Sequence, residues 1–209
     1  VLLAETLDDI IGGVKYAKEH NLGVAIRSGG HSWAAWSVRE ETLLIDLGLY
    51  QEMDYDPATG IASATPATKG GEVLDPYLAS VGRFFNGGHC PTVGIGGFLL
   101  QGGQGWVARG WGWAAESVVA VDVVTADGEL IRADETQNQD LYWAARGAGP
   151  SFPGVVTRFY LRTRPRYKQA VESVQLYRLE EFQDILKWVY TIHDQVSTDV
   201  EIVIVSQCG

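Results

Sequence analysis

The sequence predicts an α+β fold, and three observations carry that prediction. The chain opens with an amphipathic helix that leads into an apolar strand. Residues 117–133 place alternating β-branched side chains on both sides of Asp127-Gly128, which predicts a hairpin with a two-residue turn. A short helix at residues 138–147 and a long strand at residues 154–165 follow. With 46% apolar and 20% charged residues, the 209-residue chain is globular, and its length allows one domain and part of another.

The elements before the hairpin are predicted from local patterns. Thr6 can cap a helix over residues 6–20, which has acidic residues in its first turn. The buried stripe of that helix is expected to contain Leu7, Ile10, Ile11, Val14 and Ala17. Strands are predicted at residues 22–28, at residues 42–47 and within residues 59–67, and the first of them is apolar enough to be buried. A helix at residues 70–82 is interrupted or started afresh at Pro76.

The composition changes at residue 168. Residues 168–209 contain a single glycine, the last residue. Their pattern predicts a strand at residues 170–177, a helix at residues 180–194 and a strand at residues 200–206. We therefore divide the chain into a first domain at residues 1–166 and the incomplete start of a second domain at residues 167–209. The chain is expected to be a fragment of a longer protein.

Charge and hydropathy argue against two classes of partner. The net charge of −10 argues against nucleic acid, because binding to phosphate backbones needs a basic surface. No apolar run is long enough to span a membrane. The two cysteines, Cys90 and Cys208, could form a disulfide, but their contexts do not favour one. Neither the compartment nor the oligomeric state can be inferred from these features.

The most unusual segment is residues 87–112, which contain ten glycines. Glycine loses more conformational entropy on folding than any other residue and packs no side chain, so this density is unusual for an ordinary core. It favours a backbone that lies against a large, partly anionic ligand. RSGGHSW, residues 27–33, follows a predicted strand and offers a second turn rich in backbone amides. We interpret the two segments as opposite walls of one cofactor site.

His31, His89 and Cys90 admit three interpretations. A structural zinc site usually brings CxxC or HxxxH spacing, and neither is present. A cysteine nucleophile needs a base, yet Cys90 is followed by Pro91 and not by a helix N-terminus. In the third interpretation, which the glycines favour over buried core residues, His31 and Cys90 attach a cofactor. A Rossmann motif is rejected, because GIGG at residues 94–97 matches only in part and follows no predicted strand.

RSGGHS (residues 27–32) and CPTVGIGG (residues 90–97) resemble the berberine-bridge-enzyme-like branch of the flavoproteins related to vanillyl alcohol oxidase and p-cresol methylhydroxylase. The resemblance covers residues 5–165 and includes AKEHNLGVAIRSGGHS, VVAVDVVTADGELIRA and DLYWAARGAGPSFPGVVTRF. It implies a two-lobed FAD-binding domain of the p-cresol methylhydroxylase type, followed by the beginning of an α+β substrate domain.

The resemblance also implies a bicovalent FAD, with His31 bonded to the 8-methyl carbon of the flavin and Cys90 to ring carbon 6. The further cofactor-binding residues that it implies are Arg27, Ser28, Gly29, Gly30 and Ser32 around the pyrophosphate, Thr92, Gly94, Gly96, Gly97 and Gly102 along the ribityl chain and ring, and Val121 through its backbone at the adenine end. Val93 occupies a position at which a small residue favours oxidase behaviour in the family. No metal is expected.

By the same resemblance, the whole protein is an FAD-linked oxidase. It would take a hydride from a small sugar, alkaloid or polyketide and pass the electrons to molecular oxygen, releasing peroxide. The alternatives are a dehydrogenase with another acceptor, a flavin-binding module without turnover and a zinc-bound binding protein. Phe98 departs from the many plant members that have histidine there, so a polar flavin contact is missing or supplied elsewhere. The catalytic base is expected in a missing C-terminal part, since His193 and Glu201 are candidates by residue type alone, and the 209 residues alone are expected to be inactive.

Overall fold

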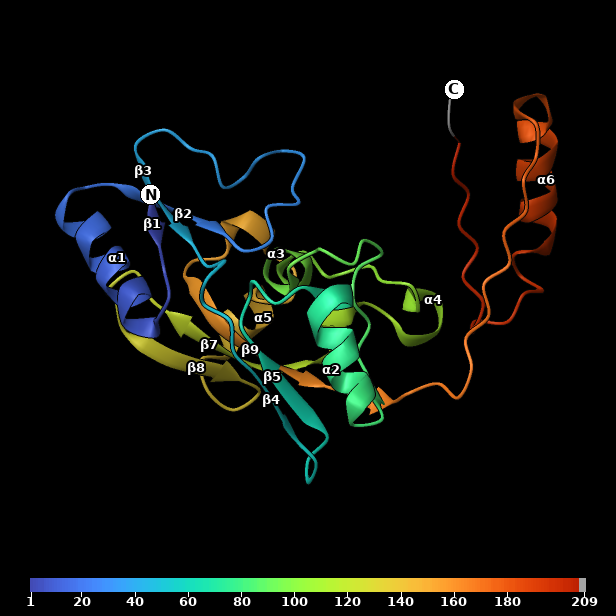
Figure 1. Cartoon of the computed structure of the whole chain (residues 1–209). Coiled ribbons are helices and arrows are strands. Elements are labelled where there is room, and N and C mark those ends of the chain that lie inside the picture. Colours follow the sequence, from blue (N-terminus) through green and yellow to red (C-terminus); the bar gives the residue numbers. More distant parts are fainter. Residues whose placement is uncertain (207–209) are drawn as a thin grey trace.

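The computed structural model describes residues 1–206 and has the α+β architecture predicted from the sequence. Figure 1 shows α1 and three strands at one side of the molecule, a larger sheet in the middle, and a C-terminal segment with α6 standing apart. The helices are α1 (Leu7–Glu19), α2 (Asp75–Ser80), α3 (Ile95–Leu100), α4 (Ala108–Trp111), α5 (Gln139–Ala144) and α6 (Phe182–Ile192). The strands are β1 (Leu2–Leu3), β2 (Gly23–Arg27), β3 (Thr42–Asp46), β4 (Met53–Asp56), β5 (Ile61–Ala64), β6 (Arg83–Phe84), β7 (Val118–Val124), β8 (Leu130–Asp134), β9 (Val155–Arg162) and β10 (Arg164–Pro165).

The first lobe consists of α1 and a parallel sheet with strand order β1-β3-β2. The N-terminus of α1 is a capping box, in which the Thr6 hydroxyl accepts a hydrogen bond from the Asp9 backbone N–H (3.2 Å) and the Asp9 carboxylate accepts one from the Thr6 N–H (2.9 Å). The predicted stripe is confirmed, with Ile10, Val14 and Ala17 buried and Leu7 and Ile11 partly buried. β1 was not predicted, because two residues are too few to show an alternation.

The second lobe is built on a five-stranded antiparallel sheet with strand order β4-β5-β9-β7-β8. The predicted β7–β8 hairpin is confirmed, but its turn differs by one residue from the prediction. Gly128 N–H donates to the Thr125 carbonyl at 2.9 Å, so Ala126 and Asp127 are the central residues. Gly128 follows them with a φ of 75°, a conformation that favours glycine. The turn therefore has three residues in place of the predicted two.

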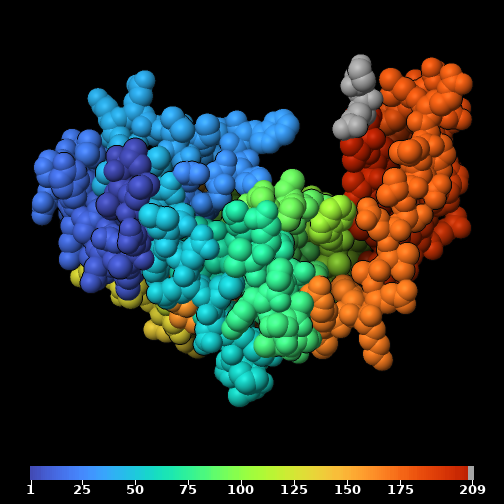
Figure 2. Space-filling model, in the orientation of Figure 1, coloured from blue at the N-terminus to red at the C-terminus, as the bar shows by residue number. Residues whose placement is uncertain are grey.

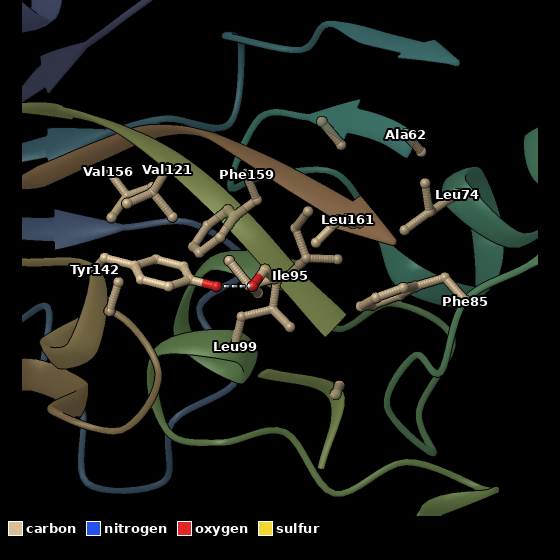
Figure 3. Packing of buried hydrophobic residues seen from close by; sticks show 14 of the residues in the cluster. Ala62, Leu74, Phe85, Ile95, Leu99, Val121, Tyr142, Val156, Phe159 and Leu161 are labelled. Atoms are coloured by element: carbon tan, nitrogen blue, oxygen red, sulfur yellow. Dashed lines mark hydrogen bonds between the residues drawn. The ribbon is translucent and has the colours of Figure 1, made fainter. Parts of the chain in front are cut away.

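The core consists of two hydrophobic clusters, and the smaller one joins the two lobes. The larger cluster lies between the five-stranded sheet and the surrounding helices, and Figure 3 shows Phe159 and Leu161 of β9 at its centre. There the Tyr142 hydroxyl donates to the Val118 carbonyl at 2.8 Å, which satisfies a buried polar group. The smaller cluster joins Val124 and Val155 of the second lobe to α1 and β3 of the first lobe. The two lobes thus share a core and form one folded unit.

The glycine-rich segment contains two short helices that the sequence analysis did not predict, α3 and α4. Before it, residues 70–74 form a π-helical turn, and α2 begins afresh at Asp75 with Pro76 in its first turn. The predicted interruption of the 70–82 helix is therefore confirmed, and its position fits proline, which lacks the N–H that a helix interior needs.

The C-terminal segment differs in kind from the rest of the described chain. α6 confirms the predicted helix, preceded by a 3₁₀ turn at Leu179–Glu181. The strands predicted at residues 170–177 and 200–206 are wrong, because neither segment pairs with another described strand, and a strand exists only through hydrogen bonds to a neighbour. No residue from 167 to 206 is buried. Cys208 lies outside the described residues, within which no helix is both long and apolar enough to cross a bilayer.

Candidate cofactor site

A cleft of about 760 Å³ is lined by residues of both lobes. The first lobe contributes β2 and the loop that follows it, and the second contributes Gly94, Gly96 and Gly97 together with residues 124–127, 149–150 and 152–156. The cleft explains why β2 is less buried than expected. Of its apolar residues only Ala25 is buried, and Val24 is 38% exposed, because β2 forms part of the cleft wall.

The two predicted attachment motifs meet at His31 and Thr92. The Nε2 atom of His31 lies 2.9 Å from the Thr92 hydroxyl oxygen, a hydrogen-bond distance between residues 61 positions apart in the sequence. Cys90 lies two residues before Thr92 and its side chain is exposed. His31 is exposed as well, so neither predicted attachment residue is used by the core.

The backbones of the two glycine-rich segments are in direct contact. A Cβ atom on Gly94 would lie 2.8 Å from the backbone nitrogen of Gly29, too close for any side chain. No ligand can lie between them at this point, so the interpretation as opposite walls is wrong here and the segments form one continuous wall. Close packing of the backbone explains part of the glycine density that the sequence analysis assigned to a ligand.

Gly97 differs from Gly94 because the space around it is open. It lines the cleft within α3, and a Cβ atom built there meets no atom within 4 Å apart from its chain neighbours and the backbone of its own helix. A glycine inside a helix is less favourable than alanine by about 0.5–1 kcal/mol. The protein itself gives no steric reason for that loss, whereas a flat group lying against this face of α3 would. The cleft and the open face of α3 at Gly97, which together we call the cradle, therefore fit a large cofactor.

The cleft is more basic than the acidic chain around it. Among the described residues that line it, Lys18, Arg27 and Arg39 are cationic and Asp127 is the acid. Arg27 lies 2.5 Å from Asp46, whose carboxylate also accepts the Gly48 N–H at 2.9 Å. At the end formed by α1 and the β7–β8 turn, Lys18 pairs with Asp127 at 2.5 Å. The hydrogen bond and charge of this pair raise the pKa of Lys18 and lower that of Asp127.

The predicted site residues fall into two groups. Those that line the cleft are Arg27, Ser28, Gly29, Gly30, His31, Ser32, Val93, Gly94, Gly96 and Gly97. Those that do not line it are Cys90, Thr92, Gly102 and Val121. Val121 is fully buried in β7, and its predicted role used only its backbone. Gly102 has a φ of 95° and packs against the Trp113 ring.

Several cleft residues were missed by the sequence analysis. The segment at residues 149–156 contributes Gly149, Pro150 and Phe152, and the β7–β8 turn contributes Thr125 and Asp127. The first segment belongs to a stretch that carried the family resemblance, which was the available signal. The turn also lies in a stretch that carried the resemblance, but a polar turn looks the same at the surface and at a cleft, so nothing marked Thr125 and Asp127 as cleft residues.

The described residues contain no group of three or more histidine, cysteine, aspartate or glutamate side chains that could hold a metal ion. Near Cys90, the His89 ring instead packs edge-on against Trp106, with ring centroids 4.3 Å apart. His89 is thus positioned by an aromatic contact next to the predicted attachment loop.

Comparison with known proteins identifies the fold and the cofactor class. A family model described as an FAD-binding domain matches residues 1–134. The chain belongs to this FAD-binding family. It is 44% identical over 201 residues to the FAD-linked oxidoreductase janO of Penicillium janthinellum, covering 96% of this chain and 44% of that protein. The chain therefore spans less than half the length of this curated relative.

Solved structures place the FAD-binding chain among the berberine-bridge-enzyme-like flavoproteins. Carbohydrate oxidase from Microdochium nivale, in complex with a substrate analogue, aligns with a TM-score of 0.74 at 38% identity, over 78% of this chain and 35% of that one. A variant of berberine bridge enzyme in complex with (S)-reticuline aligns with a TM-score of 0.72 at 26% identity, over 78% and 33%. The predicted two-lobed FAD-binding fold of the p-cresol methylhydroxylase type is confirmed.

Proposed function

We propose that the whole protein is an FAD-linked oxidase whose flavin is attached to both His31 and Cys90. The observation that carries the proposal is the contact between His31 and Thr92, which joins the two attachment motifs beside a cleft of FAD-binding type. Relatives with the names FAD-linked oxidoreductase and carbohydrate oxidase support the class of reaction. The substrate is a small organic molecule of the sugar, alkaloid or polyketide type.

The residues of this chain bind and hold the cofactor. Residues 28–32 line the cleft and their backbone amides would hold the pyrophosphate, whose charge the cationic side chains around the cleft would favour. The Arg27–Asp46 pair fixes the end of β2 from which this loop begins. Gly97 leaves room for the flat part of the cofactor. Val93 lies in the cleft wall three residues after Cys90, where a small side chain leaves access for oxygen.

FAD supplies the redox chemistry when bound, accepting two electrons from the substrate and giving them to oxygen. Oxidation breaks one substrate C–H bond as a hydride and releases one proton from the adjacent oxygen or nitrogen. Molecular oxygen then takes the two electrons and two protons and becomes hydrogen peroxide. Each covalent attachment of the flavin likewise passes two electrons and two protons to oxygen. At His31, attachment would replace one methyl C–H bond and one imidazole N–H bond by a C–N bond, and oxygen would take the two electrons and two protons and leave as peroxide. At Cys90, a ring C–H and an S–H bond give a C–S bond.

Two measurements on the full-length protein test the reaction. Mixing with candidate donors under anaerobic conditions should bleach the flavin absorbance, and admitting air should restore it with one peroxide per substrate. Bleaching that is restored by another acceptor but not by air would identify a dehydrogenase. Absence of bleaching by any donor would leave a flavin-binding module without turnover, contrary to the proposal.

A pair of glycine substitutions tests the cradle separately from turnover. Gly97→Ala should stabilise the flavin-free chain by about 0.5–1 kcal/mol and weaken FAD binding, because its methyl group enters the cleft. Gly12→Ala is the matched control, since Gly12 also lies in a helix with open space around it but away from the cleft. It should stabilise the chain equally and leave FAD binding unchanged. Equal FAD affinities for both variants would contradict a cofactor on this face of α3.

A further inference from the structure

We propose that Thr92 is a positioning residue for flavin attachment at His31. In this account the Thr92 hydroxyl oxygen accepts the Nε2–H of His31 and thereby orients the imidazole ring. The Nδ1 atom then carries the lone pair and is the atom that bonds to the flavin. The inference rests on the proposed attachment at His31 and assigns Thr92 a role in that attachment, which differs from the contact with the ribityl chain that the family resemblance implies.

Thr92 is held on a fixed loop. The Pro91 carbonyl accepts hydrogen bonds from the backbone N–H groups of Gly71 and Glu72, each at 3.0 Å. The Val93 carbonyl accepts one from the Gly70 N–H at 2.9 Å. The residues on both sides of Thr92 are therefore tied to the π-helical turn before α2. Its hydroxyl group is presented from a backbone whose position is already determined.

His31 lies on a segment with much less support. Residues 28–41 form neither helix nor strand, and His31 itself is exposed. Gly30, immediately before it, has a φ of 68°. An exposed side chain on such a loop samples several rotamers, and one hydrogen bond to a fixed partner selects among them. Thr92 is therefore the anchor, and His31 is the group that it orients.

The hydrogen bond also selects the tautomer. A neutral imidazole carries its proton on one nitrogen and a lone pair on the other, and the partner of one nitrogen sets the state of both. When Nε2–H donates to Thr92, the Nδ1 lone pair is available to form the C–N bond. The proton on Nε2 is then the one lost when attachment is complete. A side chain at residue 92 without an acceptor leaves both tautomers and many rotamers populated.

Attachment rates in a Cys90→Ala background isolate the role of Thr92, because only the His31 bond can then form. Full-length protein prepared without flavin is mixed with saturating FAD under air, and acid-stable flavin is followed by intact mass. Thr92→Val removes the hydroxyl at nearly constant volume and should slow attachment about tenfold. Thr92→Ser restores the hydroxyl and should react within about twofold of the Cys90→Ala parent. Thr59→Val, on the β4–β5 turn, is the matched surface control and should have no effect.

The outcomes separate the two proposals. Reversible FAD binding is measured by fluorescence for each variant. Attachment rates are compared at saturating FAD, so that weaker reversible binding does not affect the comparison. Equal attachment rates for Thr92→Val and its parent would overturn the role of Thr92. Slow attachment in Thr92→Ser as well as Thr92→Val would also overturn it, since packing and not the hydroxyl would then matter. A Cys90→Ala parent without acid-stable flavin would overturn the attachment at His31 itself, and this inference with it.

Discussion

Residues 1–166 and residues 167–206 fold by different means, although the sequence predicted helices and strands in both. Every buried apolar side chain of the described chain lies at or before Leu161. In the C-terminal segment, Trp188 is 52% exposed and Leu176 is 93% exposed. Figure 2 shows this segment, in orange and red, projecting from the body beside a wide gap above the green glycine-rich region.

The comparison shows which sequence patterns form their secondary structure without a partner from elsewhere in the chain. α6 forms because a helix closes its hydrogen bonds within one segment. The two predicted strands around it do not form, because a strand needs a partner from elsewhere. In the first region the partners are present, and β9 pairs with both β5 and β7. The C-terminal segment thus has apolar residues at the spacing expected for helices and strands, but these residues are not buried in a core.

The largest expected effect distinguishes a core aromatic residue from an exposed one. Phe159→Ala removes a fully buried ring from the larger cluster and should lower the free energy of unfolding of the 209-residue chain by about 3–5 kcal/mol. Trp188→Ala removes a larger, exposed ring from α6 and should change it by less than about 0.5 kcal/mol. Urea unfolding measures both. A loss at Trp188 comparable to that at Phe159 would show that α6 is packed against the body.

An intermediate effect is expected at the junction of the two regions. The Arg109 guanidinium of α4 donates to the carbonyls of His193 and of Val196, the latter at 2.9 Å, where α6 ends. Arg109→Ala should release this segment and speed chymotrypsin cleavage in α6 about tenfold, with little change in the melting of the body. Arg162→Ala, an exposed arginine on β9, controls for the lost charge. Unchanged cleavage in Arg109→Ala would mean that Arg109 does not hold the segment.

The smallest effect is expected at the Lys18–Asp127 pair, where both partners are exposed. Asp127 has its pKa lowered below 3.8, so its stabilisation is present above that value and is lost as pH falls through the lower, folded pKa. Lys18 has its pKa raised above 10.5, so its stabilisation is present below that value and is lost as pH rises through the higher, folded pKa. A double-mutant cycle with both residues changed to alanine should give a small coupling at neutral pH that disappears in about 1 M salt. A coupling that survives salt would show that the pair is more shielded than its exposure indicates.

The sequence predicted best those features that depend on neighbouring residues. The helix cap at Thr6 and the β7–β8 hairpin were both predicted, although the centre of the hairpin turn was placed one residue late. α3 was missed because its glycines contradict helix propensity, and it is supported by packing of Ile95 and Leu99 into the core.

At the site, the motifs were predicted but their arrangement was not. Nothing in the sequence indicates that Gly29 and Gly94 touch or that His31 reaches Thr92, because both contacts depend on how distant segments pack. The sequence analysis also assigned all the glycines one purpose. The structure separates a glycine required by neighbouring backbone, Gly94, from one with free space above it, Gly97.

The attachment of flavin to His31 and Cys90 is the central claim, and peptide mapping tests it most directly. The full-length protein is precipitated in acid, digested, and its flavin-bearing peptides are identified by mass. Our account predicts acid-stable FAD on the peptides that contain His31 and Cys90. It also predicts that His31→Ala and Cys90→Ala each retain flavin and that the double variant loses it from acid-treated protein. A wild-type protein of unmodified mass after acid treatment would contradict covalent attachment.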